Sequence, residues 1–109
     1  MKMKNGEIIN LLNGLDRLSD VELPVKIAYG IKKNIKKLMA EYQDYDDQRI
    51  ELVKKHNNDE KSKDYGKELR ELLDIETDIE FYKIQESVFE TGDFNITPQQ
   101  LGTLDFMIE

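Results

Sequence analysis

The sequence contains no cysteine, and this absence excludes several kinds of chemistry at once. Without a thiol there is no disulfide framework, no thiolate zinc site, no iron–sulfur cluster and no cysteine nucleophile. The single histidine, His56, lies between a pair of lysines and a pair of asparagines, which is typical of the solvated end of a helix. We therefore expect no metal ion, no cofactor and no catalytic residue, and we interpret the protein as non-catalytic.

Glycine and proline are also scarce, with six and two residues respectively. The glycines are scattered, so none forms the spacing of a phosphate-binding loop. The acidic group Asp44, Asp46 and Asp47 does not make a calcium loop of the EF-hand type. Counted from Asp44, the required glycine and the required closing acid fall on Arg49 and Lys55.

Long apolar runs are missing as well; the apolar stretches are short, such as Ile8-Ile9 and Leu72-Leu73. A membrane-spanning helix needs roughly 20 consecutive apolar residues. The first residues, Met1 to Glu7, lack the apolar core of a secretory signal. We expect no contact with a membrane and a place in the cytoplasm of the cell that makes the protein.

Charge of both signs is abundant but unevenly placed. Residues 1–40 hold eight basic and four acidic residues, a balance of +4, whereas residues 41–109 hold eight and nineteen, a balance of −11. These values sum to the net charge of −7. An acidic majority opposes nucleic-acid binding over the whole surface, but it allows a local basic contact.

Helical periodicity dominates the first half of the 109-residue chain, which has the size of one domain. Apolar residues predict a short helix over 5–18, with Asn5 as its cap, and the alternation in residues 1–4 allows a short strand before it. Pro24 is suited to the first position of a second helix, which continues to about Lys55. That helix carries heptad spacing, flawed at Arg49 and His56, and its length of roughly 45 Å suggests that one end protrudes or finds a partner.

The second half is more mixed. Residues 57–63 predict a loop, and renewed periodicity from Tyr65 predicts a third helix that forms a hairpin with the long one. Alternation over 77–85 favours a strand, with a continued helix as the alternative, and Val88-Phe89 could extend it. A turn is predicted at 91–93. Thr97, Pro98 and Gln100 then predict the start of a last helix of about ten residues. The expected fold class is α+β, mainly α, in a single domain.

Five lysines form the clearest charged feature of the long helix. At 100° per residue, three of them fall opposite the apolar seam and two flank it, so they form an exposed basic stripe. No arginine and only Tyr29 accompanies the stripe, and base readout usually needs Arg, Asn or Gln. We favour a solvated helix face; nucleic acid and an acidic protein are the alternatives, and we do not expect appreciable duplex binding. The residues of the stripe are Lys26, Lys32, Lys33, Lys36 and Lys37.

Two tyrosines, Tyr42 and Tyr45, lie on the seam of the same helix. Their hydroxyl groups need hydrogen-bond partners if they are buried. We expect the two side chains to pack against the third helix. The alternative is that they anchor an interface with another protein, where tyrosine is enriched.

Two stretches together carry a family resemblance. One runs from Leu23 to Ile35 into a helix rich in Glu and Tyr, and the other is the ending Phe94 to Ile108. The combination resembles a family of small, uncharacterised phage and prophage proteins of Gram-positive bacteria. The resemblance implies expression in a bacterial host cytoplasm and transfers no active site.

These observations predict a small phage or prophage accessory protein that acts through protein–protein interaction, with another protein or with itself as a homodimer. One alternative is a virion-associated or assembly protein that self-associates through the long helix. The other is a DNA-associated protein that uses the basic stripe.

Overall fold

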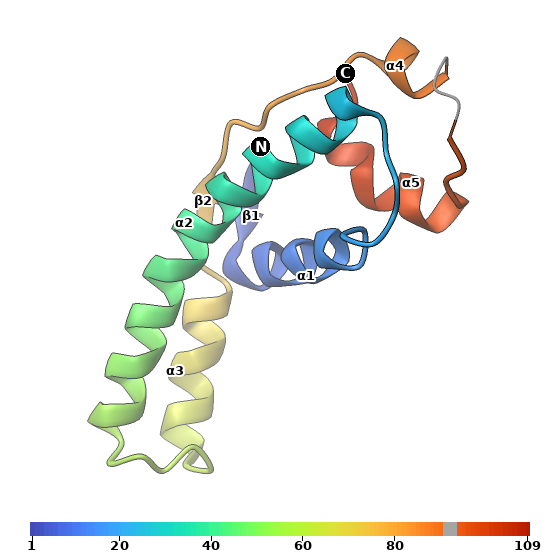
Figure 1. The fold of residues 1–109 in the computed structure, drawn as a ribbon. Coiled ribbons are helices and arrows are strands. Elements are labelled where there is room, and N and C mark those ends of the chain that lie inside the picture. The colour runs from blue at the N-terminus through green and yellow to red at the C-terminus, as the bar shows by residue number, and fades with distance from the viewer. Residues whose placement is uncertain (91–93) are drawn as a thin grey trace.

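The computed structural model describes residues 1–90 and 94–109, so the turn predicted at 91–93 lies outside the described residues. The fold is mainly helical, with one small sheet, as the sequence predicted (Figure 1). Its longest dimension is 54 Å, against 25 and 19 Å in the other directions, because one long helix sets the length of the molecule.

The chain begins with strand β1 (Lys2–Lys4), which pairs antiparallel with β2 (Glu76–Asp78). Helix α1 (Asn5–Asp16) follows without a linker. The prediction that Asn5 caps this helix is wrong. Because the sheet holds residues 2–4, the helix starts at Asn5 itself, and the side-chain amide of Asn5 donates to the carbonyl of Leu72 at 2.9 Å. The backbone N–H of Lys4 donates instead to the carboxylate of Glu7 at 3.0 Å.

The long helix, α2 (Val25–Lys55), is continuous over 31 residues. Pro24 is its N-cap rather than its first helical residue. Helix α3 (Lys63–Leu73), capped by the Ser62 hydroxyl, runs back along the second half of α2, so the predicted hairpin is confirmed (Figure 1). Helix α1 packs against the first half of α2.

Local contacts explain the two flaws in the heptad seam, one within α2 and one across the hairpin. Arg49 is paired with Asp46, at 3.0 Å from its Nε and from its Nη2 to the same carboxylate oxygen. This hydrogen bond raises the pKa of the Arg49 guanidinium. His56 lies edge-on to Tyr65 of α3, and its Nε2 is 3.3 Å from Glu68. Polar residues are tolerated on the seam because each finds a partner there.

The strand predicted over 77–85 is shorter than expected. Only Glu76–Asp78 pairs with β1; the chain then continues extended along α2, and Ile84 forms an isolated parallel bridge with Ile108. The alternation holds as far as Tyr82, because Ile79 and Phe81 are buried and Glu80 and Tyr82 are exposed; it breaks at Ile84, which is buried three residues after Phe81. The suggestion that Val88-Phe89 extends the strand is wrong, since both lie in the short helix α4 (Glu86–Glu90).

The last helix begins as predicted. Thr97 and Gln100 form a reciprocal capping box with Pro98 at the start of α5 (Pro98–Leu104), which passes into a 3₁₀ turn, η1 (Asp105–Met107). Helix α5 lies against α1. The buried side chains form a core where α1, the first half of α2, the extended segment and α5 meet. Its fully buried members include Ile8, Leu15, Ile27, Leu38, Leu104 and Met107.

Candidate functional site

Neither a metal cluster nor a membrane span is found in the part of the chain that the structure describes. Among residues 1–90 and 94–109, no three His, Cys, Asp or Glu side chains are grouped as metal ligands would be. Within the same residues, no helix has both the length and the apolar character needed to cross a bilayer.

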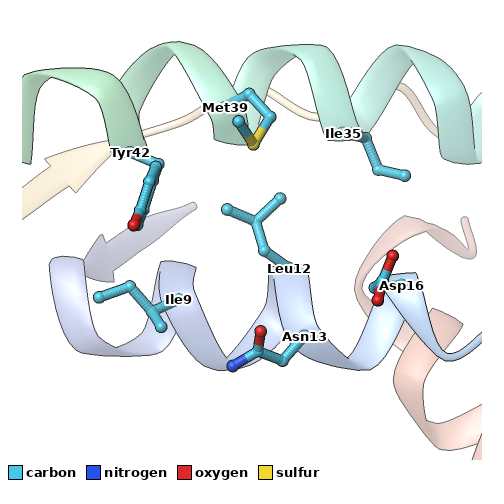
Figure 2. Close-up of a pocket in the computed structure, with 7 residues that line it drawn as sticks. All are labelled: Ile9, Leu12, Asn13, Asp16, Ile35, Met39 and Tyr42. Atoms are coloured by element: carbon cyan, nitrogen blue, oxygen red, sulfur yellow. The ribbon is translucent and has the colours of Figure 1, made fainter. Parts of the chain in front are cut away.

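The first candidate is an open, mainly apolar groove between α1 and α2, with a volume of about 330 Å³. Leu12 of α1 points toward Met39 of α2, and the ring of Tyr42 points from α2 toward Ile9 of α1 (Figure 2). Met39 is 46% exposed although its neighbours in the groove are apolar. An exposed thioether over an apolar floor is a common feature of surfaces that bind proteins. The groove residues are Ile9, Leu12, Asn13, Asp16, Ile35, Met39 and Tyr42.

The structure places Tyr42 and Tyr45 in different surroundings, although their rings are in contact. Their rings are stacked, with centroids 5.9 Å apart and an angle of 11° between planes. Tyr42, however, lines the groove beside α1, whereas Tyr45 is buried. Burial raises the pKa of the Tyr45 hydroxyl. The expectation that both pack against the third helix is therefore wrong for Tyr42, which stays available to a partner.

The five lysines of the predicted stripe are all exposed, but they do not form one surface. By helical geometry Lys32 borders the groove, Lys36 lies about 20° from Tyr29 around the helix, and the other three lie on the far side from the groove. On that far side, Lys37 donates to the backbone carbonyl of Glu80. The ammonium of Lys33 lies over two tyrosine rings, 5.2 Å from the centroid of Tyr29 and 5.6 Å from that of Tyr82.

Tyr82 is the residue that sequence reasoning missed. It comes from the extended segment, and its ring meets Tyr29 edge-to-face, with centroids 5.9 Å apart and an angle of 86°. Asn34, which is completely buried, holds it in place. The amide of Asn34 donates to the carbonyl of Tyr82 at 3.0 Å and accepts from its N–H at 2.8 Å. A polar residue four positions before Leu38, on the buried side of α2, was the only signal of this contact.

A third cluster lies at the far end of the hairpin. Lys55 binds the Glu68 carboxylate at 2.8 and 3.0 Å, and His56 contacts the same carboxylate. The hydrogen bond from Lys55, followed by that from His56, lowers the pKa of Glu68. These contacts join α2 to α3, so the cluster has a structural role.

Comparison of the chain with protein-family models, with curated proteins and with solved structures finds no match.

Proposed function

We propose that this protein is a non-catalytic protein-binding module whose principal binding surface is the groove between α1 and α2, and whose occupant is a second copy of the same chain. One observation carries the proposal. Met39 is 46% exposed and lines an open, mainly apolar groove with Tyr42, whereas Ile27, Ile31 and Leu38 in the same half of α2 are buried in the core. Covering such a groove releases water from apolar surface, and this drives association.

Charge along α2 favours an antiparallel partner helix. Residues 26–37 carry five lysines and no acid, although Lys26, Lys33 and Lys37 point away from the groove, whereas residues 41–51 carry five acids and only one basic residue. A two-fold axis crossing α2 near Glu41 places the basic segment of each copy opposite the acidic segment of the other. A parallel arrangement would oppose like charges, which is unfavourable. The antiparallel interface is isologous, so it closes as a dimer.

Helical geometry identifies the residues that make this contact. Lys36 and Asp47 project about 20° apart from the solvent-exposed side of α2, about 60–80° around the helix from Met39, so they lie beside the groove rather than in it. In the antiparallel pair, Lys36 of one copy approaches Asp47 of the other, and Met39 lies over the groove of its partner. Charge pairs at the rim set the orientation, while the apolar centre supplies most of the affinity.

The test is the molar mass in solution as a function of concentration, measured by light scattering and by sedimentation. We expect a dimer that Met39→Glu converts to a monomer. The matched control is Val25→Glu, which adds the same charge to the same helix at a residue that is 83% exposed and outside the groove. Val25→Glu should remain dimeric. A wild-type chain that is monomeric at every concentration would contradict the proposal.

A charge swap tests the orientation separately. Lys36→Glu should weaken the dimer, and Lys36→Glu combined with Asp47→Lys should restore it, because both chains of the pair carry the swap. If the double variant is weaker than the single one, the helices are not antiparallel in this register.

The resemblance to phage and prophage proteins supports an accessory role in the bacterial host cytoplasm. Self-association through α2 is also what a virion-associated assembly protein requires, so assembly is the second candidate. The position of the gene distinguishes the two: neighbouring tail and lysis genes favour assembly, and neighbouring early genes favour an accessory role against the host.

A further inference from the structure

We propose that the protein has a second binding surface, for single-stranded nucleic acid, on the side of α2 away from the groove. We call it the tyrosine–lysine patch. It consists of Lys26, Tyr29, Lys33 and Lys37 of α2 and Tyr82 of the extended segment.

The aromatic part of the patch is accessible. Tyr29 is 51% exposed and Tyr82 is 39% exposed. Both rings therefore reach solvent, although they also contact each other edge-to-face. Exposed aromatic rings are the platforms on which unpaired bases stack in proteins that bind single strands. Because every base has a π face, this contact needs no sequence-specific donor or acceptor.

The charged part of the patch surrounds the rings. Lys26 and Lys33 lie three residues before and four residues after Tyr29, so all three side chains share one face of the helix. Lys37 continues that face by one turn, and the three lysines span about 16 Å of helix. From Val25 to Ala40, α2 carries no acid. Residues 79–85 contain one acid, Glu80, whose backbone carbonyl accepts from Lys37.

A base that stacks on the tyrosine rings must replace the Lys33 ammonium, which contacts both of them. At an exposed site a cation–π contact is weak, so a base can displace the ammonium from the rings. The released ammonium is then free to pair with the phosphate beside that base. One residue therefore switches from a ring partner to a phosphate partner.

A single strand fits the patch better than a duplex does. Within a duplex the bases are stacked on one another and cannot stack on tyrosine, and the patch contains no Arg, Asn or Gln to read base edges. The sequence argued against nucleic acid because only Tyr29 accompanied the lysines; the fold adds the second ring, Tyr82. An acidic protein segment is the alternative occupant, and it would use the lysines but not the rings.

Fluorescence anisotropy with labelled oligothymidylate and oligouridylate of about 15 nucleotides tests the proposal on the full chain. We expect binding that weakens with salt along a log–log slope of about −2, from three phosphate contacts on a single strand. Tyr82→Ala should weaken binding about tenfold, as loss of one stacked base implies, whereas Tyr82→Phe should retain it. Equal binding of the two oligonucleotides indicates that the patch does not distinguish DNA from RNA, and a preference identifies the strand it takes; either outcome supports a single-strand site.

Matched variants separate the patch from general electrostatic attraction. Lys33→Glu should weaken binding and make the slope shallower by about 0.7. Lys54→Glu makes the same charge change on the same helix outside the patch and should have little effect. Far-UV circular dichroism confirms that each variant is folded.

Three results would overturn the inference. The first is an absence of binding at low salt, and the second is equal affinity for the single strand and its duplex. The third is tight binding of polyglutamate together with insensitivity to Tyr82→Ala, which would identify an acidic protein surface as the occupant. The dimer is tested separately, because its molar mass and its response to Met39→Glu are measured without nucleic acid and at a residue outside the patch.

Discussion

Removal of the Asn34 side chain tests how the C-terminal half is attached to the long helix. In Asn34→Ala, two hydrogen bonds to the backbone of Tyr82 are lost, at 3.0 and 2.8 Å. Each such bond contributes about 0.5–1.5 kcal/mol net, and a partly buried N–H and C=O left without partners adds a desolvation cost of about 1–3 kcal/mol per group when water is excluded. Since Tyr82 is 39% exposed, water can recover part of that cost.

We therefore expect Asn34→Ala to lower the free energy of unfolding by about 2–4 kcal/mol. This is a large fraction of the roughly 5–15 kcal/mol of a typical domain. Urea denaturation followed by far-UV circular dichroism gives the value, provided that the transition is two-state. The matched control is Asn10→Ala, at an exposed position of α1, which should change stability by less than about 0.5 kcal/mol.

A second variant, Asn34→Asp, should have a stability that depends on pH. The carboxylate can still accept from the Tyr82 N–H, but it cannot donate to the Tyr82 carbonyl, and burial should raise the pKa of the new carboxyl. A raised pKa means that the protonated form is favoured in the folded state, so the variant should be closer to wild type at about pH 4 than at pH 7. A loss below about 1 kcal/mol for Asn34→Ala, or no pH dependence for Asn34→Asp, would refute the role assigned to Asn34.

Other substitutions have contrasting expected effects, each measured by the same denaturation assay. Gly30→Ala should destabilise by about 1–2 kcal/mol, because a new methyl group would lie 2.5 and 2.8 Å from core side chains and outweigh the gain in helix propensity. Gly66→Ala, whose methyl group would meet nothing within 4 Å beyond its own helix and chain neighbours, should instead stabilise by up to about 1 kcal/mol. Thr97→Ala should cost about 1 kcal/mol by removing the cap of α5. The hydrogen bond from Lys55 lowers the pKa of Glu68 in the folded protein. The ionised Glu68 therefore stabilises the fold above its unfolded pKa of about 4.3, and this stabilisation is lost as the pH falls through the lower folded pKa. Glu68→Gln should remove that part of the dependence of stability on acid pH.

The sequence by itself determined the elements that depend on neighbouring residues. The 3.6-residue period of α2, the reciprocal cap formed by Thr97 and Gln100, and the polar loop before α3 are all local signals. They are readable because the hydrogen bonds and side-chain pairs that form a helix join residues three or four positions apart. The exposure of the five lysines on α2 followed from the same geometry.

The tertiary structure alone decided what the extended segment does and which surfaces remain open. The alternation over 77–85 specified an inside and an outside face, but β1 pairs only with residues 76–78. The rest of the segment bonds to Asn34, which lies 48 residues before Tyr82 in the sequence. The same docking places Tyr82 beside Tyr29, and the packing of α1 leaves Met39 uncovered. Contacts between residues so far apart leave no periodic signal in a single sequence, because their partners are set by how the helices and strands pack rather than by local conformation.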